Sequence, residues 1–360
     1  MKSGTAEYVN IGLMGIALVA AAILPFEVFL FSYAFLGPLH YLTEISWLHD
    51  RQYFSPKKRD WIPLVALSFL ILFGSSMILG QGWVDFLNNI PIGKDGLGTF
   101  LGEYGYDMTF IAFGIALLFV LSKNTWIRVY GVVGIIFAAF LFHAGTEDPG
   151  VSSFEYGAYF KVFAIYMPTL IHVYLFTGAF ILFGALKRNK ASGYISFGFF
   201  VLCGVLAFIL PANTGYEASA WARDAYEPTF GALSKFGMAD FMGMSPAEAY
   251  TADLFTAGPS LILARFIAFA YTYHYLNWFS KTSIIQWHKV PRARFIAVIA
   301  LYVASIALYL ASYDIGFRWL FLLSFAHVLL EFPLNHQSFI GIGRELRAKL
   351  FGKPQAAASK

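Results

Sequence analysis

The feature that most constrains this chain is a series of ten apolar segments, each close to the length that crosses a lipid bilayer. About 20 apolar residues in a helix span a hydrocarbon core of about 30 Å, where every backbone polar group must be satisfied internally. The segments cover residues 9–24, 26–49, 60–80, 105–122, 125–145, 160–186, 192–210, 254–280, 293–314 and 317–338. The sequence therefore predicts an all-α fold, a polytopic transmembrane helix bundle of about ten spans.

Composition supports this class. Of 360 residues, 58% are hydrophobic and only 13% are charged, which is typical of integral membrane proteins and not of soluble domains. The one cysteine, Cys203, excludes a disulfide framework. Because no stripe of Arg and Lys is present, we expect no nucleic acid as a partner. The apolar composition predicts membrane lipids as neighbours instead.

Basic residues concentrate in every second connection between the segments, and in the C-terminal tail. The connections at 50–60 and 187–190 are examples, whereas the intervening ones carry acids such as Asp85, Asp95 and Glu103. By the positive-inside rule, the basic connections face the cytoplasm. We therefore expect an integral protein of the bacterial inner membrane with both termini in the cytoplasm.

The predicted domain organisation is simple. Residues 1–343 form the transmembrane bundle, and residues 344–360 form a basic cytoplasmic tail. The long connection at 211–253 is expected on the outer side, as a loop with one short helix. Ser245 before Pro246 predicts the start of that helix, because Ser favours the N-cap and Pro the first helical position.

Two histidine and glutamate pairs with the same spacing lie in apolar helices. One is in GPLHYLTEISWLH, with His40 and Glu44, and the other is in AHVLLEFPLNH, with His327 and Glu331. Residues four apart share one face of a helix. An ionisable side chain at membrane depth costs a few kcal/mol or more, so it normally finds a partner and marks a functional pathway.

Four histidines lie on predicted spans that run in the same direction, so they can meet in one layer. They are His40, His172, His274 and His327. Each could instead be a hydrogen-bonding contact between helices. Together with two carboxylates, however, imidazoles are best satisfied around a divalent cation, for which we favour non-haem Fe(II) over zinc or copper.

Other ionisable residues receive simpler interpretations. Glu44 and Glu331 are predicted to be catalytic, either as direct ligands or as acceptors that fix the imidazole tautomers. His143 is placed at the outer end of its span, and three histidines near the cytoplasmic surface need no special role: His49, His288 and His336. Arg265 lies deep in residues 254–280 and is expected to pair with Asp107, with Glu27 or with a substrate head group.

These motifs resemble the Brp/Blh family of membrane β-carotene dioxygenases. The early motif of that family is similar to Gly37-Pro38-Leu39-His40 with Glu44, and its late motif is similar to His327, Glu331 and His336. Its central motif is similar to His274 and His288, although Trp278 stands where the family has a second histidine. The resemblance implies histidines on several helices around a non-haem iron, with His172, or else His143, completing the set.

The sequence thus favours a membrane-embedded iron oxygenase that uses dioxygen on a lipid-soluble unsaturated substrate. The resemblance suggests oxidative cleavage of a carotenoid. Two alternatives remain open: a proton-coupled transporter in which the histidines and glutamates relay protons, and a haem- or quinone-binding membrane protein. Gly-rich phosphate loops, CxxC pairs and GxSxG elbows are absent from the sequence, so nothing favours nucleotide hydrolysis, thiol chemistry or serine hydrolysis.

Overall fold

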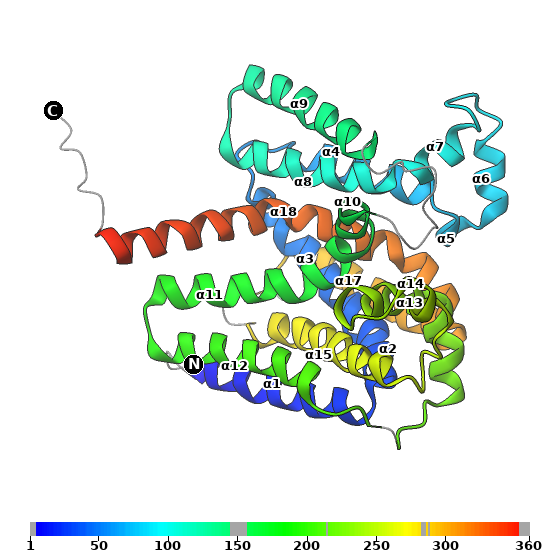
Figure 1. Ribbon diagram of the computed structural model, residues 1–360. Helices are drawn as coiled ribbons and strands as arrows, with labels where there is room; N and C mark the ends of the chain where they lie inside the picture. Colours follow the sequence, from blue (N-terminus) through cyan, green and yellow to red (C-terminus); the bar gives the residue numbers. More distant parts are fainter. Residues whose placement is uncertain (1–4, 145–156, 214, 282–285, 287–288, 353–360) are drawn as a thin grey trace.

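The computed structural model describes residues 5–144, 157–213, 215–281, 286 and 289–352, and every regular element in these ranges is a helix. The predicted all-α class is confirmed. The long helices lie roughly side by side, with the basic connections at one end of the bundle and α13 (Ala220–Phe241) and α14 (Pro246–Thr251) at the other (Figure 1).

Six helices of the described chain are long and apolar enough to cross a membrane. They are α1 (Thr5–Ile23), α9 (Thr125–Ala144), the continuous helix Ala158–Arg188, α12 (Ala191–Ile209), α17 (Arg292–Ala311) and α18 (Tyr313–Phe351). A seventh span results if α7 (Leu97–Glu103) and α8 (Gly105–Leu121), which are bent by 58°, count as one. The chain is therefore a helical membrane protein, and the ten-span count is supported in part.

The remaining predicted spans coincide with helices that are short, broken or polar. Helix α4 (Trp61–Phe73) has 13 residues, and α15 (Gly258–Ser280) has 23 but is interrupted by polar side chains. The segment at 26–49 is divided into α2 (Pro25–Phe31), a π-helical turn η1 (Ser32–Leu36) and α3 (Gly37–Asp50). Polarity and helix distortion thus concentrate in the helices that carry the predicted site.

Helix α18 joins two groups of helices. On one side it packs against α11 (Thr177–Arg188), and α11 in turn packs against α12; on the other side it packs against α4 and α8 (Figure 1). It also contacts α3 and α17. The helix continues without a break past residue 343 to Phe351, so part of the predicted cytoplasmic tail extends the last transmembrane helix.

Two backbone features position the site. The π-helical stretch η3 (Lys161–Phe176) contains Pro168, which lacks the N–H that a regular helix needs, and π-helical turns are frequent at functional sites. At the start of α3, a Cβ on Gly37 would lie 3.3 Å from the hydroxyl oxygen of Tyr275. Glycine therefore lets α3 approach α15 closely.

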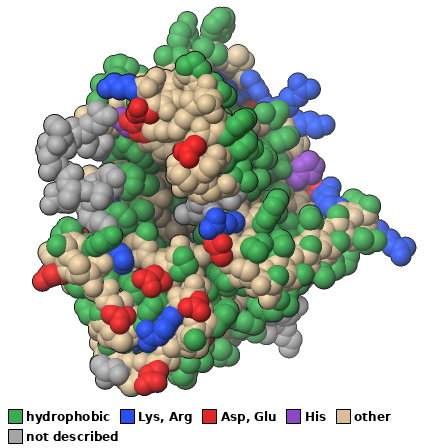
Figure 2. Space-filling view, turned by 90° about the vertical axis from the view of Figure 1, so that its right-hand side faces the viewer, with side chains coloured by type: hydrophobic (Ala, Val, Ile, Leu, Met, Phe, Trp, Pro, Cys, Tyr) green, Lys and Arg blue, Asp and Glu red, His purple; other side chains and the backbone are tan. Residues whose placement is uncertain are grey.

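The outer connection at 211–253 holds more structure than expected. Helix α14 begins after Ser245 as predicted, with a complete capping box between Ser245 and Glu248. The 22-residue helix α13 was not predicted; it contacts α2, α15 and α18 at the end of the bundle opposite the basic connections. Viewed from that end, acidic side chains gather on the lower half of the surface, with Lys and Arg side chains among them (Figure 2).

Candidate metal centre

The structure brings the four predicted histidines together, although they lie on four separate elements. His40 is on α3, His172 on η3, His274 on α15 and His327 on α18. Each is buried, with between 1% and 6% of its surface exposed. One ring nitrogen from each histidine lies within 4.8 Å of those of the other three.

The spacing of the ring nitrogens suits a single ion. The Nε2 atoms of His40 and His274 are 3.0 Å apart, and those of His172 and His327 are 3.1 Å apart. A metal with nitrogen ligands at about 2.0–2.1 Å holds neighbouring donors about 3 Å apart at right angles and opposite donors about 4 Å apart. The four imidazoles therefore have the dimensions of one coordination site and the donor type that iron, zinc and copper accept.

Two outer contacts orient the rings. The Thr177 hydroxyl lies 2.8 Å from Nδ1 of His274, and Oε2 of Glu331 lies 3.1 Å from Nδ1 of His172. A neutral imidazole carries one N–H, so a proton on Nδ1 leaves a lone pair on Nε2 directed at the centre. Metal-binding histidines commonly have partners of this kind. Sequence reasoning missed Thr177, which has no signal beyond being a polar residue shortly after His172.

The two glutamates differ in position. Oε2 of Glu44 lies 3.0 Å from Nε2 of His40, on the inner side of the ring, whereas Glu331 is at the outer nitrogen of His172. The spacing of four residues predicts that Glu331 pairs with His327 on the same helix. In the structure Glu331 instead contacts His172, which lies on another helix. The carboxyl groups of Glu44 and Glu331 also lie close enough to share a hydrogen bond. Both predicted residues thus adjoin the histidine cluster, one inside it and one behind it.

Several polar atoms of the cluster have no aligned hydrogen-bond partner among the described residues. They are Nδ1 of His40 and His327, Oε2 of Glu44, and Nδ1 of His172, whose contact with Glu331 is close but is not aligned as a hydrogen bond. A buried polar group without a partner costs about 1–3 kcal/mol, so such a concentration needs an explanation. Of these atoms, only Oε2 of Glu44 lies beside the Nε2 atoms, so a cation at the centre would use it together with the Nε2 lone pairs. The three Nδ1 atoms are at the other side of their rings and would not contact that cation.

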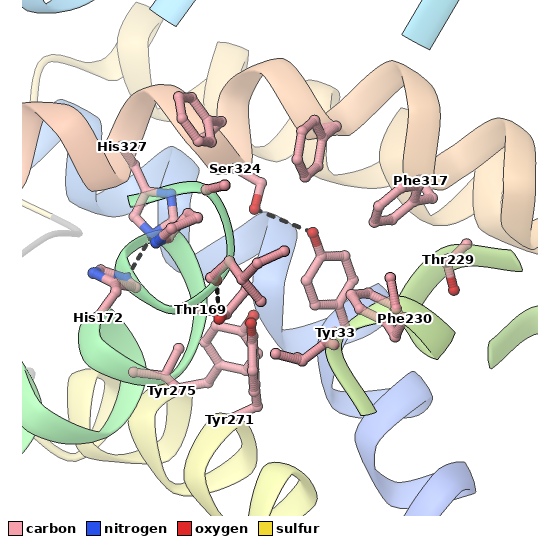
Figure 3. Close-up of a pocket in the computed structure, with 18 residues that line it drawn as sticks. Tyr33, Thr169, His172, Thr229, Phe230, Tyr271, Tyr275, Phe317, Ser324 and His327 are labelled. Atoms are coloured by element: carbon pink, nitrogen blue, oxygen red, sulfur yellow. Dashed lines mark hydrogen bonds between the residues drawn. The ribbon is translucent and has the colours of Figure 1, made fainter. Parts of the chain in front are cut away.

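A cavity of about 150 Å³ adjoins the cluster. His172 and His327 lie at one end of it, and Phe317 and Thr229 lie toward the other (Figure 3). Most of the wall is aliphatic or aromatic. The Tyr33 hydroxyl inside the cavity is 3.3 Å from the Ser324 hydroxyl. The histidine cluster therefore faces an apolar compartment.

The other histidines that the structure describes, His49, His143 and His336, do not join this cluster. His143 contacts Asp107 through Nδ1 at 2.8 Å, and Nε2 of His336 lies 2.9 Å from the carbonyl oxygen of Phe113. His49 is exposed at the end of α3. His288 lies outside the described residues.

The predicted acidic partner of Arg265 is wrong. Its guanidinium donates to the carbonyl oxygens of Ala207 and Pro211, each at 2.8 Å, and to that of Leu210. These carbonyls end α12, where the last turn of a helix leaves acceptors unsatisfied and carries partial negative charge. Asp107 and Glu27 have partners of their own, with His143 and Tyr159 at Asp107 and Tyr216 at Glu27.

No protein-family model, curated protein or solved structure matches this chain. The resemblance to the Brp/Blh family consequently rests on the sequence motifs alone. The histidine cluster and the cavities around it are therefore the features that indicate function.

Proposed function

We propose that this protein is a membrane-embedded non-haem iron oxygenase that acts on a lipid-soluble unsaturated substrate. The observation that carries the proposal is the convergence of four Nε2 atoms, with neighbours 3.0 and 3.1 Å apart, at the end of an apolar cavity. His40, His172, His274 and His327 would hold the ion. A histidine-rich site with room for further ligands suits ferrous iron, with zinc and copper as less favoured occupants.

When bound, ferrous iron would supply the binding and activation of dioxygen. The protein's part is to hold the four rings in one layer, which Glu331 and Thr177 assist from outside. Glu44 has a free oxygen beside the ring nitrogens, so it is placed to serve as an additional ligand or to accept a proton from a molecule at the centre. Burial excludes bulk water from all of these groups.

The apolar cavity favours a hydrocarbon substrate. Aromatic rings of Phe230, Phe317 and Tyr271 line it, and a conjugated chain can pack against such surfaces. At about 150 Å³ the cavity suits the part of a chain around its reacting bond, and a carotenoid is the substrate class that the sequence resemblance suggests. Oxidative cleavage would break one carbon–carbon double bond and place one oxygen atom of dioxygen on each carbon. The products are two carbonyl compounds, and no other reductant is consumed.

The membrane topology completes the proposal. Four further crossings would join the six helices that are long enough to span by themselves, one each from α3, α4, α15 and the bent pair α7 and α8. The total would be ten spans, with both termini in the cytoplasm. Helix α4 has only 13 residues, or about 20 Å at 1.5 Å per residue, so it would need a locally thin bilayer or flanking residues to complete its crossing. A lipid-soluble substrate could then reach the cavity without passing through water.

The experiment that tests this function combines elemental analysis with an optical spectrum and a product assay. We expect about one iron per purified chain, no Soret band, and dioxygen-dependent formation of carbonyl products from a carotenoid in detergent. A preparation without stoichiometric iron, zinc or copper overturns the metal-centre proposal. A Soret band favours a haem protein instead, and bound iron without carbonyl products overturns the proposed substrate class.

A further inference from the structure

The helices that carry the four histidines all run in the same direction, so the histidine layer divides two compartments. Most residues of these helices that line the apolar cavity precede their histidine, as Tyr33 precedes His40 and Tyr271 precedes His274, and the two that follow, Val173 and Tyr275, are immediate neighbours of theirs. The residues after each histidine line a second cavity of about 240 Å³, as Glu44 does after His40 and Asn277 after His274. Chain direction therefore sorts the two cavities to opposite sides of the layer.

The second cavity differs from the first in the charged groups on its wall. Carboxyl groups of Glu44 and Glu331 line it, together with Asn277, Ser338 and Lys281, between apolar side chains such as Phe180 and Trp278. His40 and His274 form its inner wall, whereas His172 and His327 face the apolar cavity. Each compartment thus reaches the centre through its own two histidines.

A smaller cavity of about 40 Å³ extends the polar path toward the end of the bundle where α1 begins and α11 ends. It shares Phe180, Asn277 and Lys281 with the polar cavity, so the two adjoin. Its wall also includes Glu7 and Arg188, which form an ion pair with N···O at 2.7 Å. Polar side chains therefore lead from this end of the bundle to the histidine layer.

We propose that this polar path, from Glu7 past Asn277 to Glu44 and Glu331, is the route by which the metal ion enters its site. The inference rests on the proposed metal centre. A hydrated divalent cation loses water only where oxygen ligands replace it, and amide and carboxylate oxygens are such ligands. The apolar cavity offers few of them, since its walls are mainly aromatic and aliphatic. Ion and lipid-soluble substrate thus reach the same four histidines from opposite sides.

Lys281 is the one cation on the wall of the polar cavity within the described chain. Lys281 also lines the smaller cavity, so it lies where the two cavities of the proposed path adjoin. Burial and the nearby Arg188 lower the pKa of Lys281 to about 8, and Glu7 opposes this shift. The positive charge of protonated Lys281 repels an incoming metal ion, so removing that charge should speed metal uptake.

The test follows metal uptake by the purified full-length chain after its metal has been removed with a chelator. Co(II) is the probe, because its visible absorption reports coordination by histidine without any need for activity. Asn277→Leu and Ser338→Leu each place an apolar side chain in the polar path, and Thr229→Leu makes the matched change in the apolar cavity. Uptake should slow at least 10-fold in the first two variants, stay unchanged in Thr229→Leu and become faster in Lys281→Met, with a final content of one cobalt per chain in all four.

Each other outcome contradicts the entry route. Equal uptake rates in Ser338→Leu and wild type, or a slower rate in Thr229→Leu than in Ser338→Leu, would overturn it while leaving the metal centre in place. Normal uptake but slow turnover in Asn277→Leu would assign the path to another small polar reactant or to protons. If the wild-type chain takes up no cobalt, zinc or iron, the entry route and the metal centre fail together.

Discussion

Two clusters of histidine and carboxylate lie in this bundle, and they are built in opposite ways. In the outer cluster, Nδ1 of His143 lies 2.8 Å from Asp107 and 2.7 Å from the Tyr106 hydroxyl, and Tyr159 donates to Asp107 at 2.8 Å. Complementary groups satisfy one another there. In the four-histidine centre, ring nitrogens face ring nitrogens.

The comparison shows which property indicates a metal site. Both clusters are buried and both combine imidazole with carboxylate, so residue type does not distinguish them. The difference is that carboxylate and hydroxyl groups partner the imidazole in one network, whereas in the other the Nε2 atoms face each other in pairs and Oε2 of Glu44 has no hydrogen-bond partner. Matched substitutions in the two clusters should therefore have different consequences.

The largest contrast is expected from removing one imidazole. His40→Ala takes away one of four donors, and we expect metal affinity to fall at least about 100-fold, beyond the 10- to 100-fold typical of outer partners. His143→Ala should leave the metal content unchanged. Elemental analysis of both variants, purified side by side, checks this, and a His40→Ala protein that keeps its full metal content would contradict the proposed centre.

Neutralising one carboxylate should have a smaller effect. Glu331→Gln keeps the shape of the side chain but weakens its hold on the His172 proton, so metal affinity should fall by about 10- to 100-fold. Asp107→Asn should lose about 1–3 kcal/mol of stability instead, because it disturbs a satisfied buried network. Chelator competition and thermal unfolding in detergent measure the two quantities. A loss of metal in Asp107→Asn would show that the clusters are coupled.

Removing one hydroxyl should give the smallest effects. Thr177→Val deletes the partner of His274 Nδ1 at nearly constant volume, and we expect about a 10-fold loss of metal affinity with little change in unfolding temperature. Tyr159→Phe should lower stability by about 1 kcal/mol and leave the metal unaffected. If Thr177→Val binds metal as tightly as wild type, the hydroxyl does not help orient the ring.

Much of the centre could be predicted from the sequence because it depends on topology. Helices that run in the same direction place residues of equal depth in one layer, so His40, His172, His274 and His327 could be grouped without coordinates. Apolar length likewise predicted the helical class. Six or seven of the ten predicted spans are supported by the length and hydropathy of the described helices. Helix α15 is not among them, because the side chains that build the site make it polar.

Contacts between helices could not be predicted, because spacing along one helix does not determine which neighbour faces it. Glu331 reaches His172 and not the histidine of its own helix, and Arg265 meets the carbonyl groups that end α12. Helix α13 was missed for a related reason. It has mixed charge and low apolarity, and only its packing against α2, α15 and α18 explains its helical state.

The position of α18 in the chain bears on how the protein is made. The ribosome delivers His40, His172 and His274 before His327, so α18 is the last of the four histidine-bearing elements to enter the membrane. A nascent chain therefore holds at most three of the four rings until α18 is inserted. If the group binds an ion as proposed, stable capture would follow the insertion of α18, and chains that stop before α18 would be released without the ion.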